Sequence, residues 1–262
     1  MDLELGGKHV LVTGGSRGIG LACVRAFAAE GARVSLVARD AARLDAAVAA
    51  LADDGHRTRG WACDLTDASA AAAMVDSVWR EAGPVDVLVN SAGAARRTPF
   101  DELTPQAWHD AMQAKFFAYI HVMDPLVKRM GARGSGAIVN VVGLGGKVAT
   151  TTHLAGGSAN AALMLASAGL ANAYAPRGVR INAVNPGLTQ TERLNEVIAA
   201  EARAQGVAPE EVLRRHHERL PLRRIAQPEE IASVVVFLAS ARASHVTGAV
   251  LSLDGASVPM VV

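Results

Sequence analysis

The sequence predicts a doubly wound α/β fold, in which one parallel sheet of about seven strands carries helices on both faces. Seven short apolar runs alternate with longer segments of helical periodicity. That alternation is typical of a parallel sheet covered on both sides. No linker rich in proline, serine or charge interrupts the chain, so we expect a single domain over residues 1–262.

Each element follows from its own run of residues. Strands are expected at about 8–13, 33–38, 57–62, 86–90, 137–142, 179–184 and 249–253. Helices are expected at about 18–30, 41–54, 68–82, 104–130, 156–175, 192–218 and 228–239. Residues that commonly begin helices support several of these starts, namely Asp40, Thr66 or Asp67, Thr104 and Pro105. The carboxyl ends of the strands then share one edge, where open α/β sheets bind ligands.

Composition narrows the class of partner. The chain has 26 basic and 25 acidic residues and no basic tract, so we expect no nucleic-acid partner and favour a small molecule. No apolar run approaches the roughly 18 residues of a membrane span, and we expect no membrane association. The first residues lack the pattern of a signal peptide, and only Cys23 and Cys63 are present. A cytoplasmic location without disulfides is therefore expected.

A glycine turn follows the first predicted strand. The residues from Thr13 to Gly20 spell T-G-x-x-x-G-I-G. A pyrophosphate requires backbone N–H groups and a helix N-terminus, with no Cβ atoms where the ligand approaches. We therefore place the turn against a dinucleotide, through Gly14, Ser16, Arg17, Gly18, Ile19 and Gly20. A turn of this kind can also serve only to tighten a strand–helix joint.

Further motifs extend the pattern along the whole chain. Asn90-Ser91-Ala92-Gly93, Asn185-Pro186-Gly187 and the run from Pro228 to Ala232 accompany the glycine turn. Together they make the chain similar to the short-chain dehydrogenase/reductase family. The resemblance implies a Rossmann-type fold, a nicotinamide cofactor, and a homotetramer or homodimer. It also implies cofactor contacts at Asp64, Leu65, Asn90, Ala92, Gly93, Pro186, Gly187, Thr189 and Thr191.

The residues after the second predicted strand indicate which nicotinamide cofactor fits. An acidic residue there would bind the ribose hydroxyls of NAD, whereas arginine would bind a 2′-phosphate. The chain has Arg39 at this position, and Arg17 in the glycine turn can join it. Asp40 comes one residue late and is better interpreted as a helix N-cap. We therefore predict NADP(H) as the cofactor.

The catalytic residues of the resembled family are missing. Where that family carries Asn, Ser, Tyr and Lys, alignment by flanking residues places Lys115, Gly143, Gly156 and Asn160. One hypothesis is that the lysine and the carboxamide have exchanged helices, so that Lys115 extends toward the position of Asn160. The alternative is that Lys115 reaches the surface and Asn160 is an ordinary helical residue.

His153 is another candidate for the missing acid, because an imidazole titrates near neutral pH. It precedes Gly156 by three residues, although a loop histidine bonded to backbone is the alternative. No metal site is expected. The segment 192–219 is expected to form a helical lid, with apolar residues available to cover a bulky, partly apolar substrate.

Three functions remain open from the sequence. The first is an NADP(H)-dependent oxidoreductase acting on a carbonyl or alcohol with a non-standard proton donor. The second is a catalytically inactive NADP-binding sensor or partner protein on the same scaffold. The third is a non-redox enzyme, such as a dehydratase, isomerase or lyase. Fold analogy alone does not decide among them.

Overall fold

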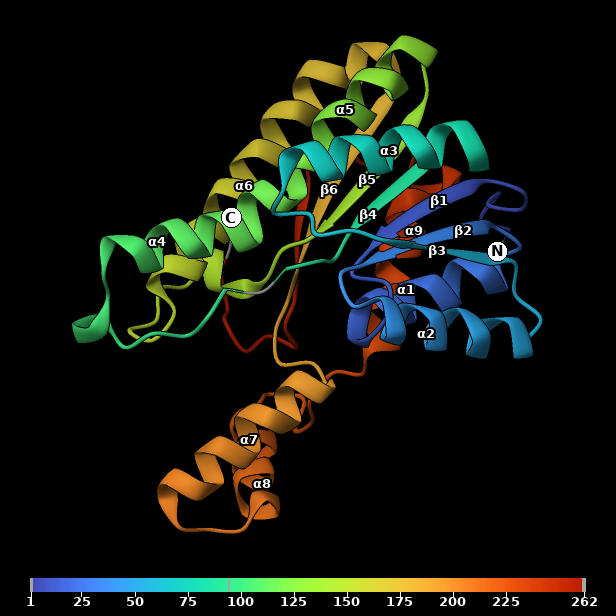
Figure 1. Cartoon of the computed structure of the whole chain (residues 1–262). Coiled ribbons are helices and arrows are strands. Elements are labelled where there is room, and N and C mark those ends of the chain that lie inside the picture. Colours follow the sequence, from blue (N-terminus) through green and yellow to red (C-terminus); the bar gives the residue numbers. More distant parts are fainter. Residues whose placement is uncertain (1, 94, 261–262) are drawn as a thin grey trace.

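The computed structural model describes residues 2–93 and 95–260 (Figure 1). Within them, seven parallel strands form one sheet in the order β3-β2-β1-β4-β5-β6-β7. The strands are β1 (His9–Thr13), β2 (Arg33–Ala38), β3 (Thr58–Ala62), β4 (Val87–Asn90), β5 (Gly136–Val141), β6 (Val179–Pro186) and β7 (Val250–Leu253). The predicted doubly wound α/β fold is confirmed. The strand order reverses between β1 and β4, the kind of position where such sheets bind ligands.

Helices cover both faces of the sheet. The α-helices of the described residues are α1 (Gly18–Ala29), α2 (Ala41–Asp53), α3 (Ala68–Ala82), α4 (Pro105–Ala111), α5 (Ala118–Arg133), α6 (Leu154–Tyr174), α7 (Glu192–Gln205), α8 (Pro209–Arg219) and α9 (Pro228–Ala239). Figure 1 shows α3, α5 and α6 on one face and α1, α2 and α9 on the other. The alternation of side chains along β1 explains both layers. Val10 and Val12 join the core under α1, α2 and α9, whereas Leu11 joins the core under α3 and α5.

Polar side chains begin several helices as the sequence predicts. The carboxylate of Asp40 accepts from the backbone of Arg43, and that of Asp67 accepts from the backbone of Ser69 and Ala70. Thr104 caps α4, with Pro105 as its first residue. Each cap satisfies backbone N–H groups that have no partner inside the helix.

The predicted helix over 104–130 contains a change of winding. A π-helical turn, Met112–Phe117, separates α4 from α5. One extra residue per turn changes which side chains face the sheet, and such turns are frequent at functional sites. Lys115 lies within this turn and is buried. The apolar periodicity of the sequence contains no signal for it.

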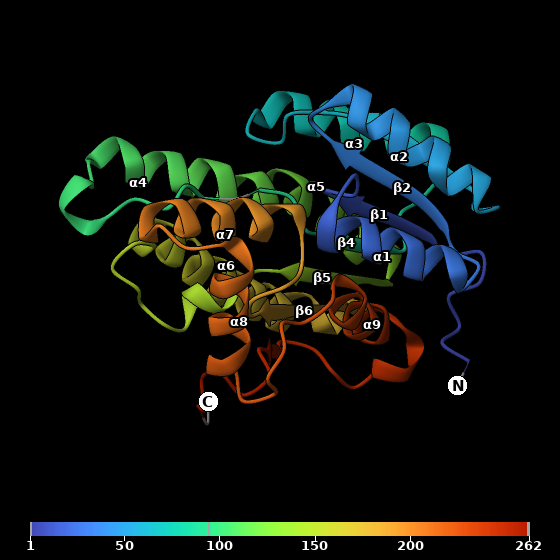
Figure 2. The same cartoon turned by 90° about the horizontal axis from the view of Figure 1, so that it is seen from below.

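The segment 192–219 forms two helices, so the single long helix expected there is wrong. Gly206 ends α7 with a left-handed φ of 66°, and Pro209 begins α8. Figure 1 shows the pair set apart from the sheet, and Figure 2 shows it from below. The apolar residues of the pair pack mainly on one another, in a small core of Leu194, Ile198, Ala202 and Val212 that Ile225 from the following loop completes. Two amphipathic helices that project from a domain need such a core of their own.

One described helical segment, Leu154–Arg177, is long and apolar enough to cross a membrane by length and composition. It is not an uninterrupted apolar run, because Ser158, Asn160 and Asn172 lie within it. The segment consists of α6 and the 3₁₀ turn after it. It packs on the sheet through Leu163, Ser167 and Ala171, all of which are buried. The arrangement is that of a core helix.

Candidate active site

A cleft of about 560 Å³ lies at the carboxyl ends of the strands, around the point where the strand order reverses. The glycine turn after β1 and the loops after β2, β3 and β4 form one part of its wall. Lys115, Gly143 and Arg193 line it as well. The sheet edge predicted to bind a ligand therefore contains a cavity.

The glycine turn is shaped by close backbone approaches. Gly14 has a φ of 69°, and a Cβ atom there would lie 2.8 Å from the carbonyl oxygen of Ser91. A Cβ atom on Gly20 would lie 2.1 Å from the carbonyl oxygen of Gly14. Among the described residues, no side chain caps the N-terminus of α1. Its first N–H groups therefore lie at the cleft without a capping partner, which fits the binding of an anion.

Arginines line the part of the cleft beside β2. Arg17, Arg39 and Arg43 all contribute to its wall. Asp40 is the N-cap of α2, as predicted, and its carboxylate accepts from the backbone of Arg43 at 3.0 Å. Arg17 lies 3.7 Å from the carboxylate of Glu192. This part of the cleft fits a phosphate group better than it fits a free ribose diol.

Most of the predicted cofactor residues line the cleft. The lining includes Asp64, Leu65, Ala92, Gly93, Pro186 and Thr191, together with Gly14, Ser16, Arg17, Gly18, Ile19, Gly20 and Arg39. Thr191 lies against the turn, because a Cβ atom on Gly18 would be 3.3 Å from its Cγ2. Gly187 and Thr189 are outside this lining, and Thr189 donates to the carbonyl oxygen of Gly187 at 3.2 Å.

Asn90 lies at the end of β4, next to the cleft-lining residues Ser91 and Ala92. Its side chain is fully buried and outside the cleft lining. It accepts from Thr13 at 3.3 Å and donates to Asn140 at 3.0 Å. Asn140 in turn donates to Ser167 on α6 at 2.9 Å. This buried polar chain ties β1, β4, β5 and α6 together beneath the cleft.

Lys115 is held at the bottom of the cleft. Its side chain is only 7% exposed, and its Nζ donates to the hydroxyl of Tyr119 at 2.8 Å and to the carbonyl oxygen of Val141 at 3.1 Å. Among the described residues, no carboxylate lies within ion-pair distance of it. Burial, with a smaller contribution from Arg193, lowers the pKa of Lys115 to about 7. The alternative in which Lys115 reaches the surface is therefore wrong.

His153 occupies the space beside Gly156, where the resembled family has its tyrosine. A Cβ atom on Gly156 would lie 2.2 Å from the imidazole Cε1 and 2.8 Å from Nδ1. On the other side of the ring, a Cβ atom on Gly145 would lie 2.9 Å from Cδ2. Nδ1 is buried without a hydrogen-bond partner among the described residues. Partial burial lowers the pKa of His153, with Arg97 contributing next.

Asn160 lies beneath the glycines of the loop after β5. Its side chain is 5% exposed, and its Oδ1 has no hydrogen-bond partner among the described residues. A Cβ atom on Gly143 would lie 3.2 Å from its Nδ2. Gly143 itself lines the cleft, with a φ of 130°. Asn160 is thus a buried residue next to the cleft, and the exchange with Lys115 remains a prediction.

Several residues of the site were missed from the sequence. Arg43, Cys63 and Arg193 line the cleft, and Tyr119 contacts Lys115. The spacing of Lys115 and Tyr119, four residues apart on a helix, could have revealed their contact. Among the described residues, no group of three or more metal-ligating side chains lies close enough to hold a metal ion.

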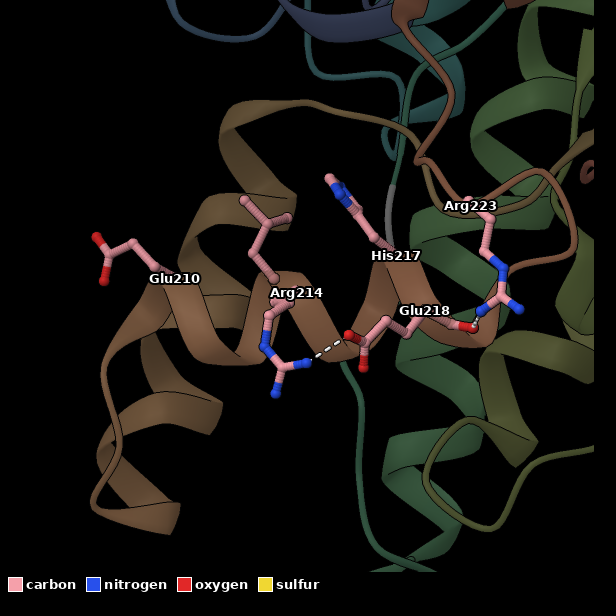
Figure 3. A pocket seen from close by; sticks show the side chains of 6 residues that line it. Glu210, Arg214, His217, Glu218 and Arg223 are labelled. Atoms are coloured by element: carbon pink, nitrogen blue, oxygen red, sulfur yellow. Dashed lines mark hydrogen bonds and ion pairs between the residues drawn. The ribbon is translucent and has the colours of Figure 1, made fainter.

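A second, smaller pocket of about 280 Å³ lies on α8, in the lid (Figure 3). It is lined by Glu210, Leu213, Arg214, His217, Glu218 and Arg223. Figure 3 shows the Arg214 guanidinium paired with the carboxylate of Glu218. None of the residues that line it belongs to the glycine turn or its neighbouring loops. It shares no wall with the cleft.

Comparison with known proteins shows strong similarity over the whole chain. The sequence model of a family described as enoyl-(acyl carrier protein) reductase matches residues 14–256. D-threitol dehydrogenase of Mycolicibacterium smegmatis is 37% identical over 97% of this chain and 94% of its own length. Gluconate 5-dehydrogenase of Gluconobacter oxydans is 33% identical over 96% and 95%, respectively.

A solved structure has the same fold. L-sorbose reductase from Gluconobacter frateurii, complexed with NADPH and L-sorbose, superposes with a TM-score of 0.94 and 32% sequence identity. The match covers 100% of both chains. The similarity therefore includes the glycine turn, the loops around the cleft and the lid.

Proposed function

Because the chain belongs to the short-chain dehydrogenase/reductase family, we propose that it is an NADP(H)-dependent oxidoreductase in which Lys115 replaces the missing acid. When bound, NADPH supplies a hydride to the carbonyl carbon of a substrate. The observation that carries the proposal is one cleft that contains both the glycine turn with its arginines and a buried lysine whose pKa is about 7.

The cofactor part of the proposal rests on the wall of the cleft. The uncapped N-terminus of α1 suits the pyrophosphate. Arg39, with Arg17 and Arg43 nearby on the same wall, suits a 2′-phosphate. The NADPH bound in L-sorbose reductase supports the same assignment.

Lys115 would transfer the proton. Reduction of a carbonyl needs a proton at the developing alkoxide oxygen, and an acid with a pKa near the working pH supplies it well. Burial brings the pKa of Lys115 to about 7. The Nζ atom is fixed by Tyr119 and Val141, and its residue lines the cleft beside Gly143. Tyr119 would act as a positioning residue for this amine.

His153 is the second candidate proton donor. Its ring lies where the side chain of the family's tyrosine would begin, and its Nδ1 is buried without a partner among the described residues. It is not part of the cleft lining, however. Lys115 is therefore the first candidate and His153 the second, and separate variants of the two residues distinguish them.

The glycines at positions 143 and 156 also favour a second candidate function. They remove two hydroxyls and leave the cofactor wall intact. That combination would suit a sensor or partner protein that binds NADP(H) without turnover. It would also suit a dehydratase, isomerase or lyase that keeps the nucleotide as a structural part.

We also propose that the protein is cytoplasmic and forms a homodimer or homotetramer. Its substrate would be a carbonyl compound or an alcohol with a bulky, partly apolar portion. Large apolar side chains are exposed on the helices that the family resemblance places at the subunit interface. They include Trp108, Phe117 and Leu165, with exposures of 38%, 39% and 77%. Sedimentation analysis tests this part, and a monomer at micromolar concentration would contradict it.

Titration of nucleotide-free protein with NADPH and with NADH tests which cofactor binds. A screen of carbonyl compounds then measures NADPH oxidation by the wild type and by the variants Lys115→Met and His153→Ala. We expect tighter NADPH binding, together with NADPH oxidation that Lys115→Met largely abolishes. Unchanged oxidation by Lys115→Met would reject Lys115 as the acid. Binding of NADPH without turnover of any carbonyl would favour the sensor or the non-redox enzyme.

A further inference from the structure

The end of the cleft beyond Lys115 carries positive charge without matching carboxylates. Arg193, from the first turn of α7, lines the cleft together with Lys115 and Gly143. Its guanidinium donates to the carbonyl oxygen of Ala95 at 3.1 Å. The Cβ atom of Ala95 would lie 2.8 Å from a Cβ atom on Gly156. Arg193 therefore extends from the lid to the loop that borders the position of the missing tyrosine.

Other cations face the same region. The pKa of Arg193 is lowered by partial burial and then by Arg97 and Arg17. Arg97 and Arg193 both lower the pKa of His153. Arg193 and Lys115 line the cleft, and His153 lies beside Gly156. Arg97 follows Ala95, the residue that Arg193 contacts, by two positions. These basic side chains therefore border the substrate end of the cleft.

Carboxylates offer little compensation to these basic side chains. Glu192 pairs with Arg17 at 3.7 Å. Glu196, one turn further along α7, acts on Arg193 more weakly than Arg97 and Arg17 do. Among the described residues, none lies within ion-pair distance of Lys115, Arg97 or Arg193. The buried Lys115 ammonium also repels like charge, so an anion there would relieve several unfavourable interactions together.

We propose that the substrate carries a carboxylate or phosphate, bound by Arg193 with Arg97 while its carbonyl faces Lys115. The inference rests on the proposed function, because it identifies the anionic group of the same substrate whose carbonyl is reduced at Lys115. An arginine fork binds either anion through paired hydrogen bonds. The position of Arg193 on α7 would also make the anion a contact that holds the lid against the body of the protein.

The test compares binding of matched acids and neutral compounds to the full-length protein in the presence of NADP⁺. One pair is 5-keto-D-gluconate and L-sorbose, which share a carbon skeleton and a ketone. The first compound carries a carboxylate where the other carries a hydroxymethyl group. A second is 4-oxocyclohexanecarboxylate and its methyl ester. L-sorbose 6-phosphate separates phosphate from carboxylate recognition. Calorimetry gives each Kd without requiring turnover.

We expect at least one acid to bind about 10- to 100-fold more tightly than its neutral partner, the range for hydrogen bonds to charged groups. Arg193→Met should abolish that preference, and Arg97→Met should reduce it. Arg193→Lys should restore part of it. Arg203→Met, an exposed residue on the same helix, is the matched control and should leave the preference intact.

Equal or better binding of every neutral partner would overturn the inference. The absence of binding of every acid at about 10 mM, a concentration above the usual KM range of about 1 μM to 1 mM, would overturn it as well. So would an equal rise in the Kd of NADPH in Arg193→Met, because Arg193 would then serve the cofactor. Acid binding that depends on Arg193 without any NADPH oxidation would instead refute the oxidoreductase and leave the anion subsite standing.

Discussion

The Nζ of Lys115 lies 2.8 Å from the hydroxyl of Tyr119, and both groups donate to the carbonyl oxygen of Val141 at the end of β5. The amine therefore has two neutral partners where a buried lysine more often has a carboxylate. Both side chains come from the helical segment that contains the π turn. Tyr119 is fully buried, and burial raises the pKa of its phenol. It stays protonated at neutral pH and can both accept from and orient the amine.

Tyr119→Phe should lower kcat for carbonyl reduction by about 3- to 10-fold, which corresponds to about 0.7–1.4 kcal/mol, the net value of one ordinary hydrogen bond. Reduction needs protonated Lys115, so the wild-type rate should fall as pH rises through about 7. Loss of the hydroxyl removes an acceptor that favours the ammonium, so the fall should move to lower pH.

The measurement is a pH profile of kcat with saturating NADPH, with NADPH binding measured in parallel. A purely structural role of Tyr119 would lower the rate equally at every pH. An unshifted profile would therefore contradict the positioning role.

Lys115→Met should stabilise the protein at low pH. The pKa of Lys115 falls from 10.5 to about 7 on folding, so the unfolded chain binds the additional proton between these values. The contribution of Lys115 to the free energy of unfolding therefore rises with pH from about 7 to about 10.5 and is lowest below pH 7. The penalty removed by methionine is at most about 5 kcal/mol.

Urea unfolding at several pH values measures the effect. The gain of Lys115→Met over wild type should be largest near pH 6 and should narrow toward pH 10. Lys128→Met, on the exposed part of α5 where Lys128 pairs with Asp124 at 2.7 Å, should show no such trend. A gain that does not depend on pH would mean that Lys115 has the same pKa in the folded and the unfolded protein, as expected for a charged lysine that is well paired.

The fold was predictable from the sequence because each strand is a short apolar run and each turn has residues that suit it. Asp40 and Thr104 cap the helices where they were expected. The site was only partly predictable. Alignment located Lys115, but the π turn that buries it has no periodic signature. The sequence places Asn90 at the end of a strand, but its hydrogen bonds with Thr13 and Asn140 are tertiary and leave no local signature. The position of the His153 ring beside Gly156 is likewise set by tertiary packing and has no signature in the sequence.

Gly156→Ala should destabilise the protein by about 1–3 kcal/mol, the usual cost of overpacking. The new Cβ would lie 2.2 Å from the His153 ring and 2.8 Å from the Cβ of Ala95. His153→Ala should remove the first conflict, so the double variant should lose less than the sum of the two single variants. A coupling above about 1 kcal/mol is expected for residues in contact.

Gly169→Ala is the control on the same helix, because no atom lies within 4 Å of a Cβ at that position. It should stabilise the helix by about 0.5–1 kcal/mol. Additive behaviour of Gly156→Ala and His153→Ala would show that the imidazole does not occupy the space beside Gly156.

Arg39→Ala should weaken NADPH binding by about 10- to 100-fold and change NADH binding by less than about 2-fold, since only NADPH carries the 2′-phosphate. Arg43→Ala should have a smaller effect in the same direction, because Arg43 lines the same wall from the first turn of α2, further from the end of β2 than Arg39. Arg25→Ala is the control, since Arg25 lies on α1 outside the cleft and near Asp54 at 3.9 Å. Fluorescence titration of nucleotide-free protein gives all of these affinities. If Arg39→Ala weakens NADPH and NADH equally, Arg39 contacts a part that the two nucleotides share, and the preference for NADP(H) needs another origin on the wall of the cleft.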